Sequence, residues 1–222
     1  MATTLQIHDS VALSLRRAPI IGVVRTASRD EAAAQARSLA ASGVELVEIT
    51  FTVPGASGLV RELLAGRSSE GPPWFGMGTV TTAPRVREAI AAGAEFIVTP
   101  NVSAEVAREA RQAGLFLVMG ALTPTEIVAA VEAGADIVKV YPLPPVGGPA
   151  YLSVVRGPLG DVPMLAAGGF GVEEIPAYRQ VGATAFGLAA PLLGAGSGEA
   201  EARQHIERAI TLARGANPEE KR

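Results

Sequence analysis

Lys139 is the residue of this sequence whose type and position most clearly suggest a role in catalysis. It is one of two lysines, the other being Lys221, whereas Lys and Arg together number 19, which leaves seventeen arginines. It lies in residues 135–142, an apolar, β-branched run that is typical of a buried strand. Burial lowers the pKa of an ammonium, and a neutral lysine can attack a carbonyl carbon, which a guanidinium cannot. The alternative is a structural lysine whose stem crosses the core while its charge reaches water.

Glu48 is a second charged residue inside an apolar run, Leu-Val-Glu-Ile-Thr at residues 46–50. A carboxylate beside a nucleophilic amine can move protons as a general acid or base. The alternative is that Glu48 and Lys139 form a buried ion pair, although such pairs add little to stability. The two residues together favour an enzyme that forms an imine with a carbonyl substrate.

Glycines next to expected strand ends offer backbone donors for an anionic substrate. One group is Gly-Met-Gly-Thr at residues 76–79, and the other is Gly168-Gly169, which the sequence predicts at the start of a helix. Free N–H groups and the helix dipole bind anions at such a start. Backbone N–H groups around Leu188 are a further candidate for phosphate.

A repeated pattern shows which elements hold these residues: alanine-rich helical stretches end in glycine, and an apolar strand begins one to three residues later. Five such joints predict eight strand–helix units, and thus an α/β fold, a single-domain (β/α)8 TIM barrel over residues 1–215. Residues 1–19 are expected to add an extra helix, and residues 216–222 a flexible tail. A doubly wound sheet is the alternative, but no glycine-rich dinucleotide loop follows the first strand. The strands are predicted at 20–25, 45–50, 74–79, 95–99, 115–119, 136–141, 162–167 and 184–188, and the helices at 28–42, 55–66, 82–92, 103–113, 124–133, 148–157, 171–181 and 200–214.

Composition narrows the range of functions. The net charge is -3 and no basic stretch contains interleaved aromatics, which argues against nucleic acid as a partner. The sequence has no cysteine and only two histidines, His8 and His205, near opposite ends, so we expect no metal site and no cofactor. No segment is long and apolar enough for a membrane span, and the Arg16-Arg17 pair precedes too short an apolar run for an export signal. A cytoplasmic location is therefore expected, with no membrane partner.

Several segments resemble the 2-keto-3-deoxy-6-phosphogluconate and 2-keto-3-deoxy-6-phosphogalactonate aldolases, which are class I pyruvate aldolases of the Entner–Doudoroff type. The likeness runs from about residue 10 to about residue 210, and the combination of motifs is specific where each alone is not. The motifs are Gly-Val-Glu-Leu-Val-Glu-Ile-Thr at 43–50, Gly-Met-Gly-Thr-Val at 76–80, Phe-Ile-Val-Thr-Pro-Asn at 96–101, Ile-Val-Lys-Val-Tyr-Pro at 137–142 and Ala-Gly-Gly-Phe at 167–170.

This resemblance implies a metal-independent homotrimer that acts on a small 2-oxo acid, with Lys139 as the Schiff-base lysine and Glu48 as the general acid/base. It also implies that Thr79 and the Gly78 backbone hold the substrate carboxylate and that Tyr141 forms a wall of the site. The expected substrate is 2-keto-3-deoxy-6-phosphogluconate, 4-hydroxy-2-oxoglutarate, or both. The matching positions that complete the predicted substrate site are Thr52, Pro100, Gly168, Gly169 and Leu188.

The chain departs from the family pattern in the part that recognises the far end of the substrate. Thr52 stands where the family has Arg or Asn, and Met119 replaces a proline. Ala167 replaces a frequent threonine, and Ala189-Ala190 replace a Gly-Ser pair that helps to bind the substrate phosphate. Each lost hydroxyl donor to a charged group is worth roughly 1.5–3 kcal/mol, so we expect only modest selection for a phosphate. A phosphate-binding isomerase or epimerase and an inactive carboxylate-binding barrel remain the alternative functions.

Overall fold

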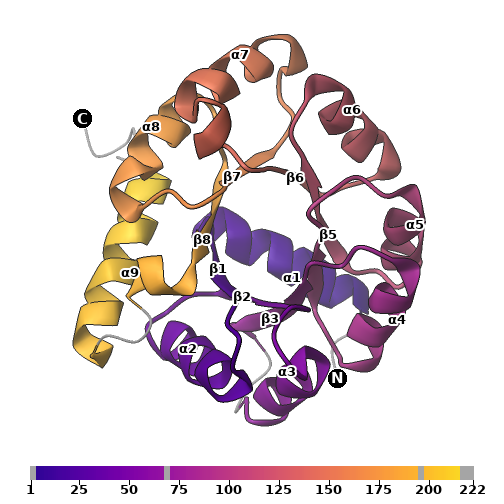
Figure 1. Ribbon diagram of the computed structural model, residues 1–222, viewed down its shortest axis with the longest axis vertical. Helices are drawn as coiled ribbons and strands as arrows, with labels where there is room; N and C mark the ends of the chain where they lie inside the picture. Colours follow the sequence, from indigo (N-terminus) through magenta and orange to yellow (C-terminus); the bar gives the residue numbers. More distant parts are fainter. Residues whose placement is uncertain (1–3, 68–70, 195–197, 216–222) are drawn as a thin grey trace.

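The computed structural model describes residues 4–67, 71–194 and 198–215. Within these residues, eight strands close into one barrel in sequence order, and each pairs in parallel with its neighbours (Figure 1). This closed order confirms the TIM barrel and rules out the doubly wound sheet. The strands are β1 (Ile20–Val24), β2 (Leu46–Thr50), β3 (Trp74–Gly78), β4 (Phe96–Val98), β5 (Phe116–Ala121), β6 (Ile137–Val140), β7 (Met164–Ala167) and β8 (Ala185–Ala189).

A ring of helices surrounds the strands, and one further helix, α1, crosses the end of the barrel at which the strands begin (Figure 1). The extra amino-terminal helix is therefore present as predicted. The α-helices are α1 (Thr4–Arg17), α2 (Arg29–Ala41), α3 (Ala56–Ala65), α4 (Ala83–Ala91), α5 (Ala104–Gln112), α6 (Pro124–Ala133), α7 (Pro149–Leu159), α8 (Ile175–Gln180) and α9 (Glu199–Arg214). Three 3-10 helices accompany them in the described residues: η1 (Pro144–Val146), η2 (Val172–Glu174) and η3 (Ala190–Leu193).

Local sequence explains where these helices begin. The hydroxyls of Ser28 and Ser103 accept hydrogen bonds from the backbone N–H groups of Glu31 and Val106, so each serine caps its helix. Thr123 forms a reciprocal capping box with Glu126. The eighth helix differs from the prediction, because residues 171–181 divide into η2 and α8. Pro176 lacks the N–H group that a continuous helix would donate to Val172.

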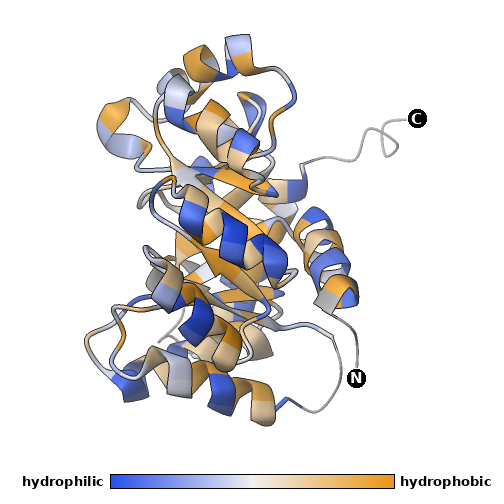
Figure 2. Ribbon diagram, turned by 90° about the vertical axis from the view of Figure 1, so that its right-hand side faces the viewer, coloured by the Kyte–Doolittle hydropathy of each residue, from blue (hydrophilic) through white to orange (hydrophobic). Residues whose placement is uncertain are grey.

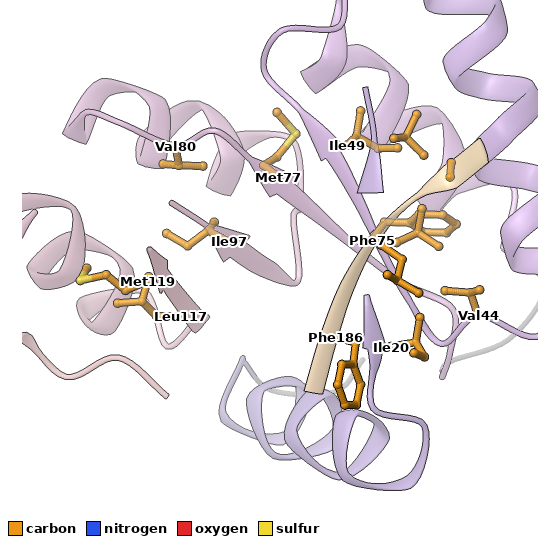
Figure 3. Close-up of a cluster of buried hydrophobic side chains, with 14 of the residues drawn as sticks. Ile20, Val44, Ile49, Phe75, Met77, Val80, Ile97, Leu117, Met119 and Phe186 are labelled. Carbon is orange, nitrogen blue, oxygen red and sulfur yellow. The ribbon is translucent and has the colours of Figure 1, made fainter. Parts of the chain in front are cut away.

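The alternation of side chains along the strands creates two hydrophobic layers. One lies between the strands and the surrounding helices and includes Ile20, Ile49, Phe75, Met77 and Phe186 (Figure 3). The other fills the barrel interior at the end where the strands begin. Hydrophobic residues accordingly gather in the strands, while hydrophilic residues lie on the outer helices (Figure 2). The second layer contains Val11, Leu15, Ile21, Leu46, Trp74, Phe96, Phe116, Ile137 and Leu165.

Helix α1 closes this end of the barrel, which we call the barrel floor. Trp74 Nε1 donates a hydrogen bond to Ser14 Oγ over 2.9 Å. His8 Nε2 lies 3.0 Å from Asp136 Oδ1, and Asp136 Oδ2 accepts from the Leu117 backbone N–H over 2.7 Å. These bonds fix α1 against the strand starts.

None of the helices among the described residues has the length and apolar character needed to cross a membrane. The predicted flexible tail, residues 216–222, and with it Lys221, falls outside the described residues.

Candidate active site

Glu48 and Lys139 both point into the barrel interior, above the layer of large apolar side chains. On β2, Leu46 faces inward and Val47 outward, so Glu48 faces inward again. On β6, Ile137 faces inward and Val138 outward, so Lys139 is also an interior residue. The side chains are 2% and 8% exposed, respectively. The strand period thus brings the two residues with the strongest chemical signal into the same enclosed space.

Glycines on neighbouring strands provide room for these two side chains. A Cβ atom added at Gly78 would overlap the carboxyl group of Glu48, so this position can only be glycine while Glu48 keeps its orientation. Gly120 pairs with Lys139 in the β5–β6 register, and a Cβ there would collide with the Pro100 backbone. The predicted site residues Gly78 and Pro100 therefore shape the interior around the two charged groups.

Burial raises the pKa of the Glu48 carboxyl group, and the positive charges of Lys139 and Arg25 only partly offset this effect. Neither Glu48 nor Lys139 makes a side-chain hydrogen bond or ion pair within the described part of the chain. A structural ion pair would bring Lys139 Nζ within 4.0 Å of a Glu48 oxygen. The two groups interact electrostatically but leave their polar atoms available to a substrate.

Tyr141, which the sequence predicts as a wall of the site, lies beside the lysine. Lys139 Nζ lies 5.3 Å from the centroid of the Tyr141 ring, which is within the range of a cation–π contact. The Tyr141 backbone N–H donates to Ala121 O over 3.0 Å, so the backbone at Tyr141 is held at the carboxyl end of β5. The aromatic face limits the directions from which a carbonyl compound can approach Nζ.

Thr79, a predicted carboxylate ligand, has the only positive φ angle of any described residue other than glycine, +59°. A β-branched residue adopts this conformation only at a cost of about 1–3 kcal/mol, and such strain concentrates at functional sites. Arg85 holds the turn in place: its Nη1 atom donates to Thr79 O over 2.9 Å and to Thr81 Oγ1 over 3.0 Å. Its guanidinium also lies 5.2 Å from the centroid of the Phe51 ring. The strained turn is thus rigid.

The glycine pair after β7 is arranged differently from the predicted helix start. Gly168 approaches the chain at residues 142–144 so closely that a Cβ would lie 2.8 Å from Leu143 N, whereas Gly169 is open to solvent. The backbone N–H of Gly171 is already bound by Glu174 Oε2 at 2.7 Å. Any anion at this loop would therefore meet Gly168 and Gly169 rather than a free helix terminus.

The remaining predicted residues lie at the end of the barrel where the strands finish, which we call the upper rim, or face away from it. The Thr52 hydroxyl is 2.7 Å from Thr50 Oγ1, and Thr50 Oγ1 donates to Val24 O, so Thr52 is the donor of this pair. The Leu188 side chain is buried in the helix-facing core, so only its backbone can contact a ligand at the rim. Ala189 follows it on the interior side and is exposed, whereas Ala190 is fully buried.

Two relevant residues were missed by the sequence reasoning. Arg25 follows β1 directly and acts on the charge of Glu48, and the rule that catalytic residues follow strand ends would have identified it. Arg85 gave no comparable signal, because it lies on α4 and only the fold brings it to Thr79. Among the described residues, no group of three or more His, Asp or Glu side chains could hold a metal ion.

Comparison with known proteins agrees with this geometry. The sequence model of the KDPG and KHG aldolase family matches residues 11–209. The chain is 30% identical over 197 residues to a probable 2-dehydro-3-deoxy-6-phosphogalactonate aldolase of Rhizobium meliloti, covering 88% of this chain and 92% of the relative. It is 30% identical over 179 residues to the 2-dehydro-3-deoxy-6-phosphogalactonate aldolase of Escherichia coli, covering 80% and 86%.

A solved structure described as native KDPGal is similar with a TM-score of 0.77 at 28% identity, over 88% of this chain and 94% of that one. A 4-hydroxy-2-oxoglutarate aldolase/2-deydro-3-deoxyphosphogluconate aldolase from TTHB1 gives a TM-score of 0.76 at 26% identity, covering 96% and 100%. A family model that covers most of the chain and relatives of nearly equal length leave little room for another assignment. With its closed barrel and its interior Glu48 and Lys139, the chain is an aldolase that belongs to the KDPG and KHG aldolase family.

Proposed function

We propose that this enzyme cleaves a 4-hydroxy-2-oxo acid to pyruvate and an aldehyde through an imine on Lys139. The observation that carries the proposal is the enclosed pair itself: an amine and a carboxyl group that face the same interior without pairing to each other. A buried pair kept only for stability would bind directly, because unpaired buried charges are costly. Unpaired groups next to space provided by glycine suit a substrate that supplies the missing partners.

In the proposed reaction, neutral Lys139 Nζ attacks the C2 carbonyl carbon, and loss of water gives a protonated imine. Glu48 accepts the proton of the C4 hydroxyl group, the C3–C4 bond breaks, and its electron pair moves into the imine to form an enamine. The aldehyde leaves, Glu48 returns the proton to C3, and water hydrolyses the imine to release pyruvate. The raised pKa of Glu48 suits both proton transfers.

We further propose that the rim of the barrel binds the two ends of the substrate. The strained Thr79 turn and the Gly78 backbone bind the substrate carboxylate, with the positive charge of Arg25 nearby. Gly168, Gly169 and the Leu188 backbone contact the far end, together with Thr52 and Pro100. The substrate is 2-keto-3-deoxy-6-phosphogluconate, 4-hydroxy-2-oxoglutarate, or both, and no cofactor is required.

Reduction of the imine tests the mechanism. Incubation with pyruvate and borohydride should add one reduced pyruvate to Lys139, seen by peptide mass spectrometry, while borohydride alone should add nothing. Absence of the adduct would refute the imine on Lys139. An adduct without pyruvate release from any 4-hydroxy-2-oxo acid would favour an inactive carboxylate-binding barrel.

The preference for phosphate is expected to be small, about tenfold or less in kcat/KM, which is about 1.4 kcal/mol. Backbone groups remain at the rim, but Ala167 and Ala189 supply no hydroxyl group. Rates of pyruvate release from matched phosphorylated and unphosphorylated substrates measure the ratio. The sequence alone predicts that Ala190→Ser raises this ratio, but Ala190 is fully buried in the core. We therefore propose that Ala189→Ser raises it, because residue 189 is exposed on the interior side. A thousandfold preference in the unmodified enzyme would contradict the proposal.

We propose that the enzyme assembles as a homotrimer in the cytoplasm. Apolar side chains on α6 and α7 are exposed, with Val128 at 43%, Val131 at 42% and Val154 at 76%, and such surfaces often form interfaces. A chain of a protein cage designed by fusing symmetric oligomeric domains is similar, with a TM-score of 0.77 and 28% identity. Light scattering after gel filtration should give three times the chain mass of 22.7 kDa. The apolar run after Arg16-Arg17 forms β1, which supports a cytoplasmic location over export.

A further inference from the structure

An open surface pocket of about 600 Å³ lies at the barrel floor, at the end opposite to the rim that carries the candidate active site. It borders the residues just before β1 and β8, including Pro19 and Thr184, and the last turns of α1, α7, α8 and α9. Its lining includes no acidic residue but contains four arginines, one from each of these helices. We call it the arginine cavity, and its arginines are Arg16, Arg156, Arg179 and Arg214.

Backbone groups position two of these arginines, and a glycine makes space for a third. Arg156 Nη1 donates to Val162 O over 2.5 Å, and its side chain lies so close to Gly182 that a Cβ there would be 2.7 Å from Nε. Arg214 Nε donates to Arg17 O over 2.5 Å. Arg179 lies over Gly215, where a Cβ would overlap its guanidinium. These contacts hold the side chains in place but neutralise no charge.

The four guanidinium groups have no carboxylate partner in the described part of the chain. Six other arginines there form ion pairs, for example Arg67 with Glu95 and Arg208 with Glu173. Asp136 and Asp161 line a neighbouring cavity that Arg16 also borders, but neither pairs with it. In a chain with a net charge of -3, this cavity is a local concentration of unpaired positive charge.

Favourable interaction with helix dipoles does not account for this concentration. Each of the four arginines lies in the last turn of its helix, where a helix terminus carries roughly -0.5 of an elementary charge. Four termini therefore supply about -2 against the +4 of the guanidinium groups, which leaves an excess of about +2. A dianion or a more highly charged ligand would neutralise this excess.

We propose that the arginine cavity binds a small ligand with a diphosphate group. One guanidinium group can donate two parallel hydrogen bonds to the oxygens of a phosphate group. Several guanidinium groups around one cavity therefore suit two adjacent phosphate groups better than one isolated phosphate. The volume lies within the roughly 300–1,000 Å³ of typical small-molecule sites. Gln180 adds an uncharged donor to the lining, whereas the Thr184 hydroxyl already donates to Met164 O. Such a ligand would link the ends of α1, α7, α8 and α9 across the barrel floor.

Isothermal titration calorimetry of the full-length protein tests the site with orthophosphate, pyrophosphate and ADP as separate probes. Pyrophosphate should bind at least tenfold more tightly than orthophosphate. Equal binding of ADP would identify a nucleoside diphosphate as an acceptable source of the diphosphate, and binding of pyrophosphate alone would identify the free anion. Binding of none of the probes, or equal binding of orthophosphate and pyrophosphate, would overturn the proposal.

Two double variants with the same change of charge locate the site. Arg16→Gln/Arg179→Gln removes two exposed arginines of the cavity that make no hydrogen bond in the described part of the chain. It should weaken pyrophosphate binding at least tenfold and leave pyruvate release unchanged. Arg61→Gln/Arg108→Gln removes two exposed arginines elsewhere and should have no effect on either. Equal weakening in both variants would show a general charge effect and refute the site.

Hydrogen–deuterium exchange of the unmodified protein provides a second test, independent of how the variants fold. Pyrophosphate should protect the ends of α8 and α9 and the turn before β8. Protection confined to residues 168–171 would place the anion at the rim instead and overturn the proposal.

Discussion

The two halves of the barrel interior differ sharply although the same strands build both. Near the floor, β3 contributes Trp74 and β6 contributes Ile137, which pack with other large apolar side chains. Further along the same strands lie Gly78, which leaves room for the Glu48 carboxyl group, and Lys139, so that charged groups replace apolar packing. The lower half therefore holds the fold together and the upper half is free to perform chemistry. Substitutions in the two halves should have separable effects on stability and on turnover.

The largest expected difference is between two positions of β6. Lys139→Arg should abolish pyruvate release while the protein stays folded, because a guanidinium keeps the charge but does not form the imine. Ile137→Val, in the lower half, should lower the free energy of unfolding by about 0.5–1.5 kcal/mol and leave turnover nearly unchanged. Steady-state rates and denaturant titrations measure both quantities. Substantial turnover by Lys139→Arg would refute the mechanism.

Glu48→Gln should reduce kcat by about 10²–10⁴-fold, the usual contribution of a general acid or base. Pyruvate should still be trapped on Lys139 by borohydride in this variant, since the amine is intact. If the adduct failed to form and little folded protein remained, Glu48 would instead be a structural partner of Lys139.

Two glycines of β3 sharpen the comparison within one strand. Gly78→Ala should lower kcat/KM about 10²-fold by displacing the Glu48 carboxyl group, since small misplacements of catalytic groups have effects of this size. Gly76→Ala brings a Cβ to 2.5 Å from the Phe96 ring, so it should mainly destabilise the fold, by about 1–3 kcal/mol. Activity and thermal unfolding of both variants decide the point. The same loss of stability with no loss of activity in both would show that Gly78 has no role in placing Glu48.

The pH dependence is the smallest of the expected effects. Burial raises the pKa of Glu48, and the cleavage step needs its ionised form. Therefore kcat/KM should fall as the pH drops through a value above the usual glutamate pKa of about 4.3. The residual activity of Glu48→Gln should not show this fall at low pH. A fall of kcat/KM at the ordinary glutamate pKa would indicate that the Glu48 carboxyl group is hydrated in the working enzyme.

Sequence periodicity predicted most of the fold, because glycine marks the helix ends and the strands are continuous apolar runs. All eight observed strands lie within two residues of their predicted positions. The exception among the helices is α8, where the missing N–H group of Pro176 outweighed an otherwise helical pattern. The site was predictable where an unusual residue type marked it, as at Glu48 and Lys139. The site was not predictable where only folding brings two residues into contact, as with Arg85 and the Thr79 turn.

The direction of a side chain was another limit. Alternate residues of a strand share one side of it. The candidates near the strand ends were selected by position alone, without asking which side each side chain faces. Leu188 was named for its backbone, and its side chain faces the helices. Ala189 and Ala190 were not distinguished, although Ala189 is exposed on the interior side and Ala190 is buried. On each strand, one residue known to face the interior, such as Lys139 on β6, would have shown which of its neighbours share that side.

The closed barrel floor also controls the traffic of molecules through the site. With α1 bound across the strand starts and large side chains filling the lower interior, everything that enters or leaves Lys139 must use the upper rim. Under the proposed mechanism the aldehyde leaves by the opening through which the substrate came, while pyruvate is still bonded to the lysine. A single opening and a covalent tether thus impose an order of release, with the aldehyde first and pyruvate last.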